Sequence, residues 1–218
     1  MLAIIQVRLS SSRFPRKALQ KLRGVIVLKH VIEQALRCRN VDNVIVATSE
    51  EASDDDLYRE CIKLNVACYR GSLKNVASRV SNVVMDNNLS DFVRICGDSP
   101  FLSPTLVDYG IEVFHNKSCD LLTNVCPRSF PVGQSVEILK GSVFIDNVEN
   151  LEVYGEHITQ FFYKNSNNFK IVNMKNNSDQ SQDSWAVDYP KDIKRLEELL
   201  KNEGHWRFTP SDISLQES

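Results

Sequence analysis

Residues 2–17 read LAIIQVRLSSSRFPRK, a buried strand that runs directly into a basic loop rich in hydroxyl groups. Leu2–Val7 is predicted to be the strand, because a nearly continuous apolar run is typical of a strand covered on both faces. The loop at 8–17 contains no glycine, so it is neither a Walker A loop nor a GxGxxG turn. Open α/β sheets bind ligands at the carboxyl ends of their strands, which is where this loop is expected to lie.

The loop has the composition of a phosphate-binding site. Serine hydroxyls and exposed backbone N–H groups can hold phosphate oxygens, while arginine and lysine side chains neutralise their charge. The polar side chains that crowd this turn are Arg8, Ser10, Ser11, Ser12, Arg13, Arg16 and Lys17. An ordinary basic surface loop is the alternative interpretation.

Charge is distributed unevenly along the chain, whose net charge is −2. Residues 1–40 hold nine Lys and Arg residues and one acid, Glu33. A local basic excess indicates an anionic partner. Nucleic acid is not expected, because this stretch lacks stacking aromatic residues apart from Phe14 and the whole chain is not basic. A nucleoside triphosphate is the better candidate.

The composition, 42% hydrophobic and 25% charged over 218 residues, is that of a globular protein with a substantial core. No apolar run approaches the roughly 18 residues of a membrane span, and the N-terminus lacks the basic region of a signal peptide. We therefore expect a cytoplasmic protein that does not bind a membrane. The six cysteines form no CxxC pair, which argues against structural zinc and favours free thiols.

Strands alternate with helices as far as residue 124. After Leu2–Val7, the predicted strands are Asn43–Thr48, Val66–Tyr69, Asp91–Cys96 and Cys119–Asn124. The predicted helices are Val25–Arg39, one capped by Ser53, Leu73–Met85, and one opened by Pro104. This alternation predicts βαβ units and a mostly parallel sheet.

The regular alternation of strands and helices ends after residue 124. The predicted strands there are Gln134–Leu139, Phe169–Met174 and Ser184–Val187, and a polar loop, Lys175–Asp183, separates the last two. The predicted helices are Ser142–Val148, Tyr154–Asn165, and one from Pro190 to about Glu203, before a polar tail. No repeat or linker divides the chain, so residues 1–218 are predicted to form one domain.

Two aspartates follow predicted strands. Asp98 lies in RICGDSP at 94–100, and Asp188 lies in WAVDYP at 185–190. Each alone is more often a helix-capping residue than a ligand. Two carboxylates at equivalent strand ends, in a protein with a polyphosphate loop, favour a shared Mg²⁺, because this ion is held by one or two carboxylates plus substrate phosphates.

Two weaker signals have structural alternatives. Asp54, Asp55 and Asp56 resemble the Asp-x-Asp metal motif of glycosyltransferases that use sugar nucleotides, but acids in a first helical turn already interact favourably with the helix dipole. His157 is either an acceptor-site residue or a surface histidine of a helix.

Five segments, taken in order, resemble the cytidylyltransferase family, which includes the CMP-Kdo and CMP-sialic acid synthetases. They are IIQVRLSSSRFPRKAL at 4–19, RGS at 70–72, GDSP at 97–100, EHIT at 156–159 and WAVDYPKD at 185–192. The similarity is strongest to the branch named after the spore-coat polysaccharide protein SpsF, and it extends from residue 2 to about residue 200. The N-terminal loop is its most specific part.

The resemblance implies a Rossmann-like, mostly parallel sheet flanked by helices, the nucleotide-diphospho-sugar transferase fold. A small segment at about 125–165 would serve the acceptor site and a homodimer. The nucleotide-binding residues implied are Gln6, Val7, Arg8, Ser10, Ser11, Ser12, Arg13, Lys17, Arg70 and Gly97. The substrate-binding residues implied are Arg94, Gln134, Glu137 and His157. The catalytic residues implied are Arg8, Lys17, Asp98 and Asp188, with both aspartates holding Mg²⁺.

This chain departs from the family pattern at three places. The family usually has Ala-Arg where this chain has Val7-Arg8, and glycine where it has Arg16. A bulky Arg16 would change the loop backbone or add a further cation to the phosphates. The branch often reads Gly-Leu-Asp-Val-Glu where residues 133–137 read Gly-Gln-Ser-Val-Glu. That segment borders the sugar site in relatives, so the missing acid bears on the identity of the acceptor.

The expected function is the transfer of a cytidylyl group from CTP to a sugar, a 2-keto-3-deoxy sugar acid, for surface polysaccharide biosynthesis. The alternatives are a glycosyltransferase that uses a sugar nucleotide and a non-catalytic nucleotide-binding protein. We also expect a homodimer, because Phe161, Phe162 and Tyr163 on one helix would leave apolar surface uncovered.

Overall fold

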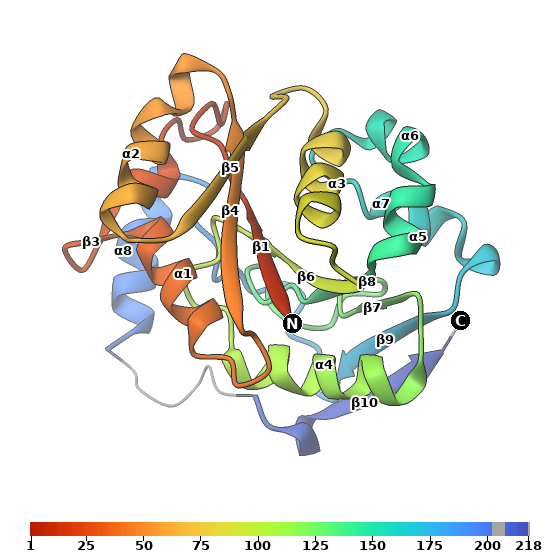
Figure 1. The fold of residues 1–218 in the computed structure, drawn as a ribbon. Coiled ribbons are helices and arrows are strands. Elements are labelled where there is room, and N and C mark those ends of the chain that lie inside the picture. Colours follow the sequence, from red (N-terminus) through yellow and green to blue (C-terminus); the bar gives the residue numbers. More distant parts are fainter. Residues whose placement is uncertain (202–207, 218) are drawn as a thin grey trace.

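The computed structural model describes residues 1–201 and 208–217. Its centre is an eight-stranded sheet in the order β10-β9-β7-β8-β6-β1-β4-β5, with helices on both faces (Figure 1). The strands are β1 (Leu2–Gln6), β4 (Asn43–Ser49), β5 (Ala67–Gly71), β6 (Asp91–Cys96), β7 (Leu121–Thr123), β8 (Glu137–Lys140), β9 (Ile171–Asn176) and β10 (Ile213–Glu217). Only β8 and β10 run against the others. The predicted Rossmann-like, mostly parallel α/β sheet is confirmed.

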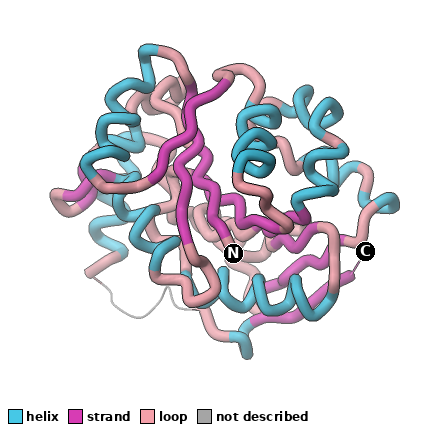
Figure 2. Tube along the Cα trace, in the orientation of Figure 1, coloured by secondary structure: helices cyan, strands magenta, loops and turns pink. Residues whose placement is uncertain are grey.

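The helices form two groups, one on each side of the sheet (Figure 2). One group is α1 (Val27–Leu36), α2 (Asp55–Lys63), α4 (Pro104–Lys117) and α8 (Pro190–Leu199), and the other is α3 (Val76–Asp86), α5 (Gly141–Asp146), α6 (Val148–Leu151) and α7 (Gln160–Lys164). In β1, Ala3 and Ile5 pack in the core of the first group, and Ile4 packs in the core of the second. This burial on both faces explains why the opening strand is apolar without alternation.

Short elements complete the chain. A hairpin of β2 (Lys21–Leu22) and β3 (Val25–Ile26) precedes α1, so the predicted helix begins two residues later than expected. Single turns of 3₁₀ helix occur at η1 (Lys17–Leu19), η2 (Ala52–Asp54), η3 (Glu152–Tyr154), η4 (Ser166–Asn168) and η5 (Pro210–Asp212). Within the described residues, no helix is long and apolar enough to cross a membrane.

The predictions up to residue 124 hold, with boundaries that move by up to three residues. One local correction concerns Ser53, which lies inside η2 rather than at the N-cap of α2. Asp54 takes the N-cap position, and its carboxylate is fully buried. It accepts hydrogen bonds from the backbone N–H groups of Leu9 (2.7 Å) and Ser49 (3.1 Å). Asp54 therefore ties the start of the N-terminal loop to the end of β4.

Two predictions after residue 124 are wrong, and one strand was not predicted. Ser184–Val187 is not a strand. Its backbone groups form hydrogen bonds with loop residues and with the side chain of Arg195 on α8, and a single isolated bridge joins Ser184 to Val132. The helix predicted over Tyr154–Asn165 is interrupted after η3 by Gly155, whose φ of 56° cannot continue it. The polar tail contains β10, an exposed edge strand that pairs with β9. The predicted end of the last helix, Glu203, lies outside the described residues.

The aromatic residues of α7 do not form an exposed apolar surface, contrary to the expectation. Phe162 is buried, and its ring lies 5.0 Å from that of Phe169. Phe161 packs against both of these rings. Tyr163 turns inward, where its hydroxyl lies 2.9 Å from that of Thr123. The helix therefore completes the core of one protomer and gives no reason by itself to expect a dimer.

Candidate active site

Two adjoining cavities, each of about 370 Å³, lie at the carboxyl ends of β1 and β6. The first is bordered by the N-terminal loop and is lined by Gln6, Val7, Arg8, Ser11, Ser12, Arg13, Lys17, Ala18, Arg79, Arg94, Cys96, Gly97, Asp98, Glu156 and His157. The second lies toward β8 and α7 and is lined by Arg13, Arg94, Cys96, Asp98, Ser99, Val125, Arg128, Val132, Gly133, Ser135, Glu137, His157, Thr159, Gln160, Tyr163, Ala186 and Asp188. The shared residues make the two cavities halves of one cleft. Their size suits small-molecule ligands.

The N-terminal loop is held by its own backbone. The N–H of Arg16 donates to the carbonyl of Leu9 (2.8 Å), which closes the loop into a compact turn. Arg16 adopts a left-handed conformation, with φ 60° and ψ 22°. Its guanidinium lies 2.7 Å from the Asp56 carboxylate, outside both cavities. Arg16 therefore adds no cation to the candidate phosphate site.

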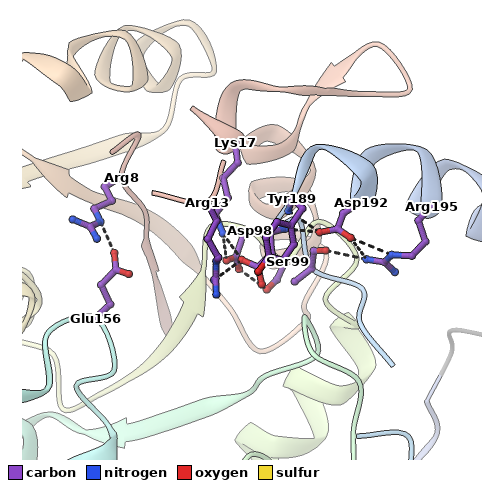
Figure 3. Close-up of polar contacts among 11 residues, drawn as sticks. Arg8, Arg13, Lys17, Asp98, Ser99, Glu156, Tyr189, Asp192 and Arg195 are labelled. Carbon is purple, nitrogen blue, oxygen red and sulfur yellow. Dashed lines mark hydrogen bonds and ion pairs between the residues drawn. The ribbon is translucent and has the colours of Figure 1, made fainter. Parts of the chain in front are cut away.

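Lys17 connects the two predicted metal ligands. Its Nζ lies 2.7 Å from Asp98 Oδ2 and 2.9 Å from Asp188 Oδ1. Arg13 reaches the same Asp188 oxygen at 2.8 Å, and Figure 3 shows Arg13 and Lys17 converging with Asp98 at this point. Burial alone would lower the pKa of Lys17, but the charges and hydrogen bonds of both carboxylates outweigh burial and raise it. The two aspartates, 90 residues apart in sequence, thus lie close enough to share one cation.

The segment that carries Asp188 is anchored by α8. The Asp192 carboxylate accepts hydrogen bonds from the N–H groups of Asp188 (2.9 Å) and Tyr189 (2.8 Å), and Arg195 pairs with it in turn (Figure 3). Burial opposes the ionisation of Asp192, yet these N–H groups and Arg195 lower its pKa. Sequence reasoning missed Asp192 and Arg195. An acid three residues after the N-cap of a helix is the capping-box signal that could have found Asp192.

A close backbone approach joins the two halves of the site. The N–H of Val187 donates to the carbonyl of Asp98 (2.9 Å). Gly97 donates to the carbonyl of Gln6 (3.0 Å), and a Cβ at Gly97 would lie 2.5 Å from the Cβ of Val7. Position 97 therefore requires glycine to keep the ends of β1 and β6 in contact.

A buried polar network lies where the two cavities meet, because Arg94 lines both of them. Arg94 pairs with Glu137, and both are buried. Arg94 also donates to the side-chain carbonyl of Gln6 (2.9 Å), and Tyr163 donates to Glu137 (2.5 Å). Burial would lower the pKa of Arg94 and raise that of Glu137, but their mutual attraction reverses both directions. Arg8 pairs with Glu156, and both residues line the first cavity.

The structure brings most of the predicted site residues to the cleft. Three predicted residues, Ser10, Arg70 and Gln134, line neither cavity. Arg70 pairs with Asp55 (2.8 Å) and donates to the backbone carbonyls of Ser49 and Glu51 at the end of β4. Gln134 is fully buried and is bonded to the backbone of the β6–α4 connection. His157 borders both cavities.

The Asp-x-Asp interpretation of residues 54–56 finds no support in the structure. Asp54 is buried under the N-terminal loop, Asp55 pairs with Arg70, and Asp56 pairs with Arg16 and Arg59. None of the three lines the cleft.

Sequence reasoning missed several residues that line the cleft, including Arg79 and Arg128. Arg79 lies on α3, is 1% exposed, and donates to the carbonyl of Ser72 (2.8 Å). Within the described residues its Nε has no hydrogen-bond partner. Arg79 could have been found, because it is a lone arginine among the apolar residues of a predicted helix. Nothing in the sequence distinguishes Arg128 from a surface arginine.

The fold and the cleft define an α/β nucleotidyltransferase. The cytidylyltransferase family model matches residues 2–205. The spore coat polysaccharide biosynthesis protein SpsF of Bacillus subtilis is 33% identical over 168 residues, which cover 74% of this chain and 69% of that protein. A 3-deoxy-manno-octulosonate cytidylyltransferase of Chlamydia trachomatis is 31% identical over 134 residues, 59% of this chain and 51% of that protein.

Structural similarity agrees with the sequence matches. A cytidylyltransferase from Leptospira borgpetersenii superposes with a TM-score of 0.88 at 26% identity, covering 97% of this chain and 91% of the other. The chain belongs to the cytidylyltransferase family and is a nucleotidyltransferase.

Proposed function

We propose that the protein transfers a cytidylyl group from CTP to a sugar acid of the 2-keto-3-deoxy class and releases pyrophosphate. The observation that supports this most is the meeting of Lys17, Asp98 and Asp188 where a cavity bordered by the basic loop joins a second cavity. A nucleotide fits the first cavity and an acceptor fits the second. The reacting phosphorus then lies between them, beside the two aspartates.

The reaction requires positioning and charge neutralisation more than covalent chemistry. An acceptor hydroxyl oxygen attacks the α-phosphorus in line, a new P–O bond forms, and the bond to the β-phosphate breaks with its electron pair on pyrophosphate. The acceptor hydroxyl loses its proton to solvent. Arg8, Arg13 and Lys17 hold the phosphates, and Lys17 is well placed to neutralise the charge that builds on the leaving group.

Mg²⁺ is part of this proposal, and the residues present fit it. Two carboxylate oxygens that already share one ammonium group are hard ligands at a separation one cation can bridge. Within the described residues no three His, Cys, Asp or Glu side chains gather into a metal site, so Asp98, Asp188 and the phosphates would hold the ion together. When bound, Mg²⁺ neutralises phosphate charge and lowers the pKa of the acceptor hydroxyl. Lys17 must then move from between the carboxylates to the phosphates.

Pyrophosphate release with CTP, Mg²⁺ and a panel of sugars tests the proposal. A cytidylyltransferase releases pyrophosphate, a glycosyltransferase releases a nucleoside diphosphate from a sugar nucleotide, and a nucleotide sensor releases neither. Asp98→Asn should abolish turnover and leave the melting temperature nearly unchanged, because Asp98 lies at a strand end outside the core. If this variant keeps more than about a tenth of the wild-type rate, a loss below about 1.4 kcal/mol, the metal role of Asp98 is wrong.

The homodimer and the cytoplasmic location belong to the same proposal. Six free cysteines suit a reducing compartment, and CTP is a cytoplasmic substrate. Light scattering at tens of micromolar protein tests the dimer, and a mass of 24.8 kDa would show a monomer instead.

A further inference from the structure

The ring of Tyr189 lies against Arg13 at the edge of the cleft. The guanidinium carbon of Arg13 is 5.7 Å from the centroid of that ring, within the distance of about 6 Å at which a cation and an aromatic face attract each other. Lys191 Nζ lies equally far from the same centroid, but Lys191 lines neither cavity, whereas Arg13 borders both. Arg13 is therefore the cation that this ring can present to the cleft.

Tyr189 is a firm support, because its backbone is fixed at the start of α8. Its N–H donates to the Asp192 carboxylate (2.8 Å). Pro190 follows it and disfavours helical backbone at the residue before it, and Tyr189 is extended, with φ −133° and ψ 158°. The backbone that carries the ring is thus held by α8 and not by the loop that carries Arg13.

Arg13 itself has little else to hold it. Its side chain is 56% exposed, and within the described residues its only polar contact is with Asp188 Oδ1 (2.8 Å). The same oxygen lies 2.9 Å from Lys17 Nζ, and Asp188 would turn to Mg²⁺ under the proposed function. When Asp188 turns away, the ring of Tyr189 is the contact that Arg13 keeps.

A contact with an aromatic face leaves an arginine free to bind phosphate. A guanidinium can stack its plane on a ring and direct its five N–H donors outward in the same arrangement. A long, half-exposed side chain otherwise loses rotamer freedom when it binds an anion, which weakens binding. A ring that already restricts Arg13 reduces this loss.

We propose that Tyr189 is a positioning residue, which holds Arg13 for the two phosphates that depart as pyrophosphate. This inference rests on the proposed function and adds to it a residue that acts on the nucleotide through Arg13. CMP lacks those two phosphates, so the contact should favour the triphosphate over nucleotides that carry only the α-phosphate. The CMP-linked product is of the second kind, so the same contact favours binding of the substrate over binding of the product.

Calorimetry with CTP and with CMP, each with Mg²⁺ and without acceptor, tests the role of the ring. Tyr189→Ala should weaken CTP binding at least about threefold, as expected for a cation–π contact at a partly exposed site, and change CMP binding less than about 1.5-fold. Tyr189→Phe keeps the ring and should bind CTP within about 1.5-fold of the wild type. A purely structural role at the start of α8 would instead weaken both nucleotides alike, and that result would overturn the proposal.

A double-mutant cycle shows whether the ring acts through Arg13. In an Arg13→Gln background, Tyr189→Ala should change CTP binding less than about 1.5-fold, because the coupling between two contacting residues disappears with either of them. A loss of about threefold that persists in that background would contradict the positioning role.

Tyr58→Ala is the matched control. The Tyr58 ring also lies against an arginine, with the guanidinium carbon of Arg70 at 5.4 Å from its centroid, and neither residue lines a cavity of the cleft. This variant should bind CTP within about 1.5-fold of the wild type.

These binding measurements need no turnover, so they separate this inference from the proposed function. If CTP binds but no sugar is converted, the proposed transfer fails and the cycle still decides the role of Tyr189. Unchanged CTP binding in Tyr189→Ala, in a protein that releases pyrophosphate from CTP, overturns the positioning role alone. A wild type that binds no CTP overturns both.

Discussion

Arg16 occupies a position where the family resemblance predicted glycine, and it keeps the left-handed backbone that glycine would favour. The predicted alternatives were a changed loop or an added cation for the phosphates. The side chain instead turns away from the cleft to Asp56. An arginine can replace glycine here because the loop requires only a positive φ at this position and not a close approach.

The first prediction concerns this residue. Arg16→Gly should leave the KM for CTP within about twofold, because Arg16 does not line the first cavity, where we propose that the nucleotide binds. The free energy of unfolding should change by less than about 1 kcal/mol. Glycine removes the strain of a left-handed arginine, but the variant also loses a surface ion pair and has a more flexible unfolded chain, and these effects nearly cancel. Steady-state kinetics and thermal melts measure both.

Arg13→Gln is the comparison variant, because Arg13 borders both cavities. It should raise the KM for CTP at least about tenfold through the loss of charge-assisted hydrogen bonds. A similar rise in Arg16→Gly would mean that Arg16 swings to the phosphates when the nucleotide binds.

At this scale the sequence could predict residues whose chemistry is local. Arg13 and Lys17 follow a strand in a compact basic loop, so their place at the cleft could be inferred without the fold. Gln134 could not be judged in this way, because its neighbours in sequence do not show that its amide is bonded to Phe101 and Ser103. Arg128, which lines the second cavity, was missed because its neighbours in sequence do not show how the distant acids of that cavity are paired.

Among the elements, the start of α8 decides where Asp188 lies. The segment before it was predicted to be a strand because WAV is apolar and β-prone. Its backbone instead bonds to Asp98 and to Arg195. Long-range contacts overrode local propensity. They also form β10, which pairs with β9 although four of its five residues are exposed.

The second prediction concerns the anchor of this segment. Asp192→Asn removes the charge that attracts Arg195 and weakens the acceptor for two N–H groups. Loss of such a cap should destabilise the protein by about 0.5–2 kcal/mol. The kcat should fall at least about fivefold because Asp188 is no longer held, whereas the KM for CTP should change less. Glu198→Gln, an exposed acid on the same helix, is the control.

Denaturant unfolding and kinetics on both variants measure these effects. A loss of stability in Asp192→Asn without any fall in kcat would show that α8 supports the fold but does not position Asp188.

At the scale of the whole molecule, the parallel orientation of β1, β4, β5 and β6 could be predicted, because a helix separates each of these strands from the next. The sequence could not show that β8 inserts antiparallel between β6 and β7. That insertion brings Glu137 beside Arg94, and Arg94 lines both cavities. The contact between Glu137 and Arg94 therefore arises from a non-local strand pairing.

The last prediction concerns the nucleobase. The charge of the N-terminal loop cannot discriminate among nucleoside triphosphates, because all of them present the same phosphates. Selection for cytosine must come from groups near the end of β1, where Gln6–Arg8 line the cavity. The Gln6 carbonyl already accepts from Gly97, and the Val7 N–H already donates to Ala47 (3.2 Å). We therefore expect the Val7 carbonyl and the Arg8 N–H to read the amino group and N3 of cytosine.

Uracil reverses this donor and acceptor pattern, and leaving a buried polar group unpaired costs about 1–3 kcal/mol. CTP should therefore stabilise the protein against heat more than UTP, ATP or GTP, and its kcat/KM should exceed theirs at least about tenfold. Thermal melts with Mg²⁺ and each nucleotide, followed by mass spectrometry of the product, measure this selectivity. Equal stabilisation by all four nucleotides would mean that the site recognises only the phosphates. A UMP-linked or GMP-linked product would overturn the cytidylyl transfer, because the two backbone groups would then bind another base.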